Sequence, residues 1–441
     1  MSGRELTGTA RADAFAAAMA AAFARAAADD AGRRAAFARF GALGLPGPRD
    51  EEWRFTDLAP LAGHDWILGR ADGAAQAGAA ELVRALPPFA HRLVLVNGVL
   101  APSLSSLGGL PAGVTVTSLA AARRERPELR AELERDADGD DALAALNAAF
   151  AADGAFVHVG AGRRVGPLAL LAVTTGAAPT MAHPRTVVLL GEGSEAELVE
   201  AHVGAPGAAT FTNAVTAITV GPGARLRHCL LECAGDAAVL RARLDLRLER
   251  DSRAAATTAT IGGALVRNDL RATLAGPGAD CRLDGLYLAT GRQHVDNHTT
   301  IDHAAPNGRS RELYKGILDG HATAVFDGKV LVAPVALKTD AVQANHNLLL
   351  SDDAVVNSKP QFNINADDVK CVHGAAIGQL REEEIFYLRT RGLTRAAARA
   401  LLLYAFASEA LGAVAAPAVR AHLEALVQAF MPTGQRLREA A

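Results

Sequence analysis

From about residue 155 onward, short apolar or alternating runs rich in Val, Leu and Thr follow one another, and small turns separate them. The turns begin at Gly191, Gly221, Arg250 and Gly276, at spacings of 30, 29 and 26 residues. Units of strand and turn that repeat at such a period are typical of a solenoid, in which each unit buries its apolar face only by stacking on the next. The pattern continues to about Gly378, and it predicts a long parallel β-helix rather than a sandwich.

The repeats lack the strict six-residue period of the left-handed β-helix found in hexapeptide acyltransferases. We therefore expect a right-handed parallel β-helix and a mainly β fold class. The glycines are interpreted as turn residues, because residues 160–166 have the wrong spacing for a dinucleotide-binding motif. No phosphate-binding loop motif occurs in the chain.

The chain before this region shows helical patterns. Large apolar residues recur at helical spacing near the N-terminus, in an alanine-rich setting: Phe15, Met19, Phe23, Phe37 and Phe40. They predict two amphipathic helices, the second of which ends at Gly41. Residues 119–150 again look helical, and residues 92–96 predict a short strand.

The C-terminal part also has a helical pattern, with leucines at helical spacing from Arg381 to about Gln428. The patterns together divide the chain into three regions. We expect a mainly helical N-terminal region over residues 1–150, a parallel β-helix core over 151–378 and a C-terminal helical domain over 379–441.

Composition limits the classes of partner. The 441 residues carry a formal net charge of −3, with a pI near 6.5, so we expect neither nucleic acid nor an anionic membrane as a partner. No uncharged apolar run reaches the ~18 residues that a membrane span needs. Four cysteines are too few for a disulfide framework, which favours free thiols and a cytoplasmic location.

Two groups of potentially reactive residues have simpler structural interpretations. His228, Cys229 and Cys233 lack the paired spacing of a zinc site, and we expect them mostly to pack within a strand over 226–232. The pairs Asp352-Asp353 and Asp367-Asp368 could suggest the acidic clusters of β-helix polysaccharide lyases. We expect these pairs instead to cap corners of the solenoid.

The segment over residues 359–374 differs from both groups. Phe362 and Ile364 alternate with polar residues, as in a half-buried strand. If a second strand follows the acidic corner, Cys371 and His373 project from the same face, with their donor atoms several Å apart. A thiolate and an imidazole so placed suit iron or a nascent iron-sulfur cluster. Two ligands cannot close a site, however, and a cysteine at this position could equally be packed.

This segment also resembles the C-terminal signature of the SufB/SufD family in its SufD form, roughly K-P-x-L-x-I-x-A-D-D-V-x-C-x-H-G-A-T. A second stretch, from Phe386 to Gly392, is similar to the F-Y-L-R-S-R-G that follows it, and Glu51-Glu-Trp-Arg-Phe-Thr56 is similar to the family's E-E-W-[KR]-[YF]-T. The departures from the signature are mild and avoid Cys371 and His373; they are Asn363, Asn365, Ala376 and Thr390. Over most of the β-helix the resemblance is one of layout.

The resemblance implies a non-catalytic scaffold subunit of the SUF complex for iron-sulfur cluster assembly. Its expected partners are a SufB-like subunit at the β-helix and a SufC-like ABC ATPase at the C-terminal domain, with a homodimer as a possible state of the isolated chain. His373 would face the SufB interface, with Cys371 ranked below it. Iron or a transient cluster would be shared with the partner subunit, and none would be firmly bound by the isolated chain. Partner-binding residues are expected in the second stretch: Phe386, Tyr387, Leu388, Arg389, Arg391 and Gly392.

Two alternatives compete with this interpretation. A SufB-type paralogue usually has Glu-His-Glu-Ala-Thr where this chain has Val372-His-Gly-Ala-Ala376, which favours the SufD type. A β-helix carbohydrate-active enzyme is the alternative of another class, and it requires acidic residues gathered in one exposed groove.

Overall fold

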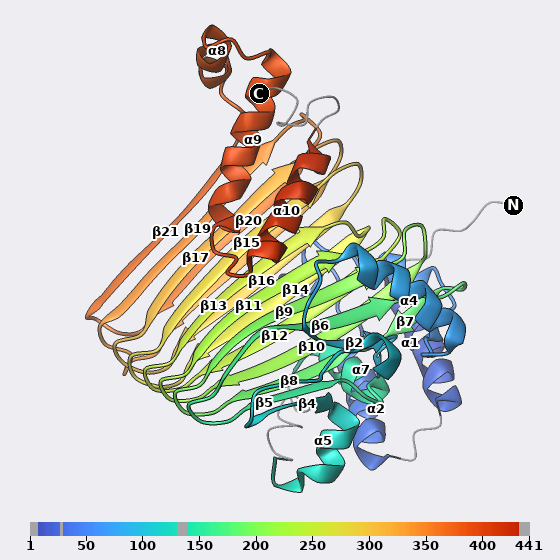
Figure 1. Cartoon of the computed structure of the whole chain (residues 1–441). Coiled ribbons are helices and arrows are strands. Elements are labelled where there is room, and N and C mark those ends of the chain that lie inside the picture. Colours follow the sequence, from blue (N-terminus) through green and yellow to red (C-terminus); the bar gives the residue numbers. More distant parts are fainter. Residues whose placement is uncertain (1–7, 27–29, 130–139, 432–441) are drawn as a thin grey trace, which may run out of the picture.

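Two parallel β-sheets form the body of the molecule, and the chain winds between them as a long parallel β-solenoid (Figure 1). The computed structural model describes residues 8–26, 30–129 and 140–431. Helices from the N-terminal and C-terminal parts lie against the outside of the solenoid (Figure 1). The predicted class, mainly β with a parallel solenoid and flanking helices, is confirmed.

The first sheet has ten strands in the order β21-β19-β17-β15-β13-β11-β9-β6-β2-β3. Their bounds are β2 (His91–Val96), β3 (Val99–Leu100), β6 (Arg164–Thr174), β9 (Glu195–Gly204), β11 (Arg225–Cys233), β13 (Arg253–Ile261), β15 (Asp280–Ala289), β17 (Arg309–Leu318), β19 (Thr339–Leu349) and β21 (Val369–Gly378). The strand predicted over 92–96 is therefore β2, and it joins the solenoid sheet by pairing with β6.

The second sheet has eleven strands, of which nine follow the order β20-β18-β16-β14-β12-β10-β8-β5-β4, while β7 pairs with β10 and β1 with β7. Their bounds are β1 (Ile67–Leu68), β4 (Val114–Ser118), β5 (Ala155–Val159), β7 (Thr180–Ala182), β8 (Arg185–Leu190), β10 (Thr210–Val220), β12 (Val239–Leu248), β14 (Leu265–Leu274), β16 (His294–His303), β18 (Thr323–Val332) and β20 (Val355–Ile364). From β8 onward, the even-numbered strands belong to the eleven-stranded sheet and the odd-numbered strands to the ten-stranded sheet, so the chain alternates between the two sheets.

The strand register confirms the repeat. Leu226 pairs with Ala254 and Ala254 with Cys281, so these coils advance by 28 and 27 residues. All three side chains are buried in the same interior core, because every second residue of a strand points to the same face. Deeper along the axis, a Cβ on Gly285 would collide with the ring of Tyr314, its partner in the register, so this position must stay glycine. Burying each large apolar side chain contributes about 1.5–3 kcal/mol, which makes the interior the main source of stability.

The N-terminal helices pack on the outer faces of both sheets. Their bounds, with the short 3-10 turns, are α1 (Gly8–Arg25), α2 (Ala31–Leu43), η1 (Glu51–Trp53), α3 (Ala59–Ala62), α4 (Gly73–Ala85), η2 (Pro102–Leu104), α5 (Leu119–Glu125), η3 (Pro127–Leu129) and α7 (Ala142–Phe150). Phe15 and Phe40 from the first two helices pack on Phe211 of β10 in one cluster. The prediction that the second helix ends at Gly41 is wrong. It runs on to Leu43, and Gly44 caps it with a φ of 71°, a conformation that glycine adopts without strain.

The C-terminal helices α8 (Glu382–Thr390), α9 (Arg395–Leu411) and α10 (Pro417–Phe430) follow the last strand. Leu403 of α9 and Leu423 of α10 are buried on the outer face of the ten-stranded sheet, whereas α8 stands away from the sheet (Figure 1). The buried Lys315 on β17 secures α9 through an ion pair with Glu409 and a hydrogen bond to the carbonyl oxygen of Phe406. Within the described ranges, no helix is long and apolar enough to cross a membrane.

Candidate functional site at the open end of the solenoid

The last coil of the solenoid leaves its edges uncovered. Strand β21 pairs only with β19 and strand β20 only with β18 in the described part of the chain, so each ten-residue strand has one free edge. Four apolar side chains of these strands are exposed: Val355, Ile364, Val372 and Ile377. A long free edge with exposed apolar residues is a template for pairing with another chain.

Cys371 and His373 lie on this last coil, on β21. The register places them beside Ala341 and Gln343 of β19, whose side chains are buried in the solenoid, so both residues share the inward face. Residues two apart in a strand are about 7 Å apart along the backbone, which is within reach of a common cluster. Both predicted donors therefore point toward the axis at the open end.

The two donors differ in their surroundings. The thiol of Cys371 is half-buried against the interior core, and burial raises its pKa. The imidazole of His373 is exposed, and its ring stacks on Phe362 of β20 with centroids 4.5 Å apart and planes at 25°. His373 is therefore the more accessible donor. Cys371 binds a metal only as a thiolate, and its partly buried environment disfavours the loss of the thiol proton.

These two residues do not complete a metal site by themselves. Among the described residues, the one group of three metal-ligating side chains within reach of a common ion is Glu52, His298 and Asp327, and it lies elsewhere. Iron or a cluster usually takes four protein ligands or an equivalent set. The open end fits such a cargo only if another chain supplies further donors.

The group of Glu52, His298 and Asp327 is already neutralised by neighbouring cations. Lys329 forms an ion pair with Glu52, and Lys359 lies 3.7 Å from Asp327. Burial alone would lower the pKa of His298, but the carboxylates of Asp296 and Glu52 raise it to about 9, so its imidazole is protonated. A hydrogen bond from His298 is the main reason why the pKa of Glu52 falls to about 2. A divalent cation would have to displace these positive charges, and the group is an ion-pair cluster.

This cluster fastens the segment 51–56 to the outer face of the eleven-stranded sheet. Glu51 accepts a hydrogen bond from Lys359 at 2.6 Å, and Thr56 donates one to Asp296 at 2.5 Å. The ring of Trp53 lies 3.8 Å from the guanidinium of Arg267. The sequence did not identify these partners in advance. It did contain a signal of them, since all five lysines of the chain lie between residues 315 and 370.

The predicted partner-binding residues lie on α8 and just after it. Phe386 and Tyr387 are 66% and 58% exposed, although large aromatic side chains usually pack. Leu388 is half-buried, and Arg389, Arg391 and Gly392 are exposed. Buried Ile385 anchors the opposite side of the helix, so the two aromatic rings are held outward.

Two family models cover most of the chain. The model described as "SUF system FeS cluster assembly, SufBD core domain" matches residues 172–406, and the "SufBD protein N-terminal region" model matches residues 16–167. The chain belongs to the SufBD family. It is 35% identical over 410 residues to an iron-sulfur cluster assembly SufBD family protein of Synechocystis, which covers 90% of this chain and 89% of that relative. It is 32% identical over 403 residues to the iron-sulfur cluster assembly protein SufD of Escherichia coli, covering 89% and 91% of the two chains.

Membership places this SufBD protein in the SUF system of iron-sulfur cluster assembly. The core model begins within β6 and ends within α9, so it includes both strands of the open coil and all the predicted partner-binding residues. The N-terminal model includes segment 51–56. The motifs that carried the resemblance thus lie in the matched regions.

The remaining cysteines of this SufBD protein belong to the fold. Burial raises the pKa of Cys229 to about 12 and that of Cys233 to about 11, and it raises the pKa of Cys281 as well. His228 is also buried, and it lies 3.1 Å from the carboxylate of Glu200. Thiols held in the protonated state are inert toward metals, so the packing interpretation of this group is supported.

The acidic pairs lie far from each other. Asp352-Asp353 precede β20 and Asp367-Asp368 follow it, at opposite corners of the last coil. Ten residues of strand separate them, which is about 30 Å, whereas the two carboxyl groups of a glycosidase lie about 5–9.5 Å apart. These pairs cannot act together as catalytic carboxylates.

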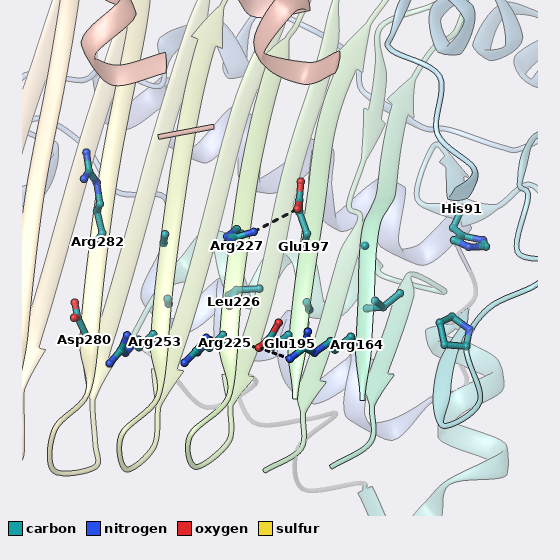
Figure 2. A pocket seen from close by; sticks show the side chains of 16 residues that line it. His91, Arg164, Glu195, Glu197, Arg225, Leu226, Arg227, Arg253, Asp280 and Arg282 are labelled. Carbon is teal, nitrogen blue, oxygen red and sulfur yellow. Dashed lines mark ion pairs between the residues drawn. The ribbon is translucent and has the colours of Figure 1, made fainter. Parts of the chain in front are cut away.

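A hollow of about 570 Å³ lies on the outer face of the ten-stranded sheet, over the first residues of β6 to β15 (Figure 2). Its acidic residues pair with arginines: Glu195 lies 3.7 Å from Arg225, and Glu197 lies 3.9 Å from Arg227. Five arginines and three acidic residues line it, so it is not an acidic groove. A carbohydrate-active enzyme therefore gains no support from this surface.

Proposed function

We propose that this chain is a non-catalytic, cytoplasmic scaffold subunit that pairs with a SufB-like subunit through the open coil and with a SufC-like ABC ATPase through the C-terminal helices. The observation that carries the proposal is the position of His373, which is an accessible imidazole on the inward face of an unpaired edge strand. An incomplete donor set at a free edge is suited to a site completed by a second subunit.

The free edges favour a partner that is itself a solenoid. Both β20 and β21 offer unpaired backbone groups over ten residues, and a partner with a similar open coil would continue both sheets. The exposed Val372 and Ile377 would be buried in the same contact. In the absence of the SufB-like subunit, a second copy of this chain would occupy the same edge, so we expect the isolated chain to be able to form a homodimer there.

Iron and the nascent cluster are the cargo of this site. A neutral imidazole ligates iron near neutral pH, and His373 is exposed enough to reach it. Cys371 ranks second, because its raised pKa disfavours the thiolate that would bind. The remaining donors would come from the SufB-like partner, so the isolated chain would hold no cluster firmly.

The ATPase is expected to dock on α8. Phe386 and Tyr387 are the kind of exposed aromatic residues that anchor protein interfaces, and Arg389 follows them on the same helix. The chain has no nucleotide-binding loop motif, so the ATPase activity would belong to the partner.

The test is a His373→Ala variant produced together with the SufB-like and SufC-like subunits. We expect the variant complex to assemble and to hydrolyse ATP, yet to bind no iron and mature no cluster, as followed by iron content and by visible absorbance. His321→Ala is the matched control, since His321 is an exposed histidine in a corner before β18. Normal cluster maturation in His373→Ala, or loss of cluster only because the complex dissociates, would overturn the ligand assignment.

A further inference from the structure

The inward face of the ten-stranded sheet carries a row of polar side chains that leads to His373. The register stacks Glu312 of β17, Gln343 of β19 and His373 of β21 on successive strands. Glu312 and Gln343 are 3% and 1% exposed. Neighbouring strands lie about 4.8 Å apart, so each of these side chains is next to the following one in the row.

Glu312 sets the orientation of the Gln343 amide. Gln343 Nε2 donates a hydrogen bond to Glu312 Oε2 at 2.7 Å. Glu312 Oε2 accepts this hydrogen bond, so the amide nitrogen is turned toward β17. Gln343 Oε1 is then left as an acceptor, and it is buried without a hydrogen-bond partner among the described residues.

The opposite sheet leaves room for this arrangement. Gly328 of β18 faces Gln343, and a Cβ at this glycine would collide with Gln343 Nε2. Phe362 of β20 stacks on one face of the exposed His373 ring. The imidazole thus stacks on an aromatic ring of one sheet, and its register neighbour on its own sheet carries an unsatisfied carbonyl oxygen.

An unsatisfied buried acceptor costs about 1–3 kcal/mol, so a donor that can reach it is stabilised there. A neutral imidazole has one N–H donor and one lone pair, and a hydrogen bond to the N–H decides which nitrogen keeps the lone pair. Histidines that ligate metals almost always donate their other ring N–H to such a partner.

We propose that Gln343, oriented by Glu312, accepts the N–H of His373 and so selects the tautomer whose other nitrogen is free to bind iron at the open end. The described structure contains no hydrogen bond between the two side chains, and a rotation of the exposed imidazole would form it. Gln343 and Glu312 are positioning residues in this arrangement, and neither is a ligand. The inference deepens the proposed function and rests on the role of His373 in it.

The experiment measures the His373 tautomer directly in the isolated chain. Nitrogen-15 spectra of the labelled histidine side chains are recorded near neutral pH, and the His373→Ala spectrum identifies the signals of His373. We expect one dominant tautomer in the unmodified chain and the mixture of a solvent-exposed imidazole in Gln343→Leu. A His373 mixture in the unmodified chain, or an unchanged tautomer in Gln343→Leu, would contradict the inference.

Further variants separate positioning from packing. Glu312→Gln still offers an accepting oxygen to Gln343, so we expect it to keep the single tautomer, whereas Glu312→Leu should lose it. If Gln343→Leu does not fold, Gln343→Asn serves instead, because its amide is polar but one methylene shorter and should also lose the single tautomer. A single tautomer in both Glu312→Leu and Gln343→Asn would refute the positioning role.

A second measurement distinguishes this inference from the proposed function. In the complex with both partners, we expect Gln343→Leu to weaken iron binding by about 10–100-fold, the range for loss of such supporting hydrogen bonds. If His373→Ala abolishes iron binding but Gln343→Leu leaves it unchanged, the inference is wrong and the ligand assignment stands. If His373→Ala binds iron normally while Gln343 still selects the tautomer, the ligand assignment is wrong instead.

Discussion

The two ends of the solenoid differ in how their edge strands are covered. At the first coil, the ten-stranded sheet ends in the two-residue strand β3 and the eleven-stranded sheet in the five-residue strand β4, both antiparallel to their neighbours. At the last coil, the ten-residue strands β20 and β21 end the same two sheets without such a cap. Short edge strands are a common protection against unwanted pairing, and only the last coil leaves long edges free in the described part of the chain, as the proposed pairing requires.

The contrast extends to side chains. At the capped end, apolar residues such as Leu93 and Val157 are completely buried. At the open end, Val372 is 63% exposed, and both candidate metal donors lie on the same strand. Apolar side chains are therefore covered at the capped end, whereas apolar and candidate donor side chains are accessible at the last coil.

The largest effect should come from the ion-pair cluster that holds segment 51–56 on the covered face. The folded pKa of His298 is raised to about 9 from 6.5, so its contribution to stability is complete below about pH 6.5 and is lost as the pH rises toward 9. The loss should reach up to roughly 3 kcal/mol. His298→Gln should flatten this part of the curve, as measured by denaturant unfolding across the pH range. His321→Gln is the control, and parallel curves for His298→Gln and the unmodified chain would contradict the assignment.

The next effect sharpens the comparison of the two ends through a matched pair of isoleucines. Ile377 at the open coil is 47% exposed and Ile67 at the N-terminal β1 is 54% exposed. Ile377→Asp should weaken pairing with the SufB-like subunit by about 2 kcal/mol or more, because it places a charge in a contact that must lose water. Ile67→Asp should leave pairing unchanged. Analytical sedimentation measures the affinity of each variant for the SufB-like subunit. Equal affinities of the two variants would show that the open coil is not the interface.

The smallest effect concerns α8. Phe386→Ala should weaken binding of the SufC-like ATPase by about 1–2 kcal/mol, since an exposed aromatic ring contributes only where a partner buries it. The exposed Phe55, which is 45% accessible and lies in the N-terminal region, provides the control as Phe55→Ala. Titration calorimetry with the ATPase is the measurement. An ATPase that binds both variants with unchanged affinity must dock elsewhere.

Much of this architecture could be predicted from the sequence because it depends on local repetition. The turn spacing near 28 residues and the alternation of apolar residues report a solenoid directly, since each coil obeys the same periodicity. Gly41 shows where local reasoning failed. A glycine inside a helix costs about 1 kcal/mol, which the packing of Phe40 in the apolar cluster can offset, so the helix ended one glycine later.

The sequence by itself determined the solenoid, the flanking helices and the motif that contains Cys371 and His373, because each is encoded in neighbouring residues. Only the tertiary structure decided which edges stay open and which side chains meet. Glu51 meets Lys359 and Glu312 meets Gln343 because the coils stack in one register, which is set by the packing of the whole interior. The same register puts Gln343 beside His373, a proximity that their separation of 30 positions in the sequence conceals.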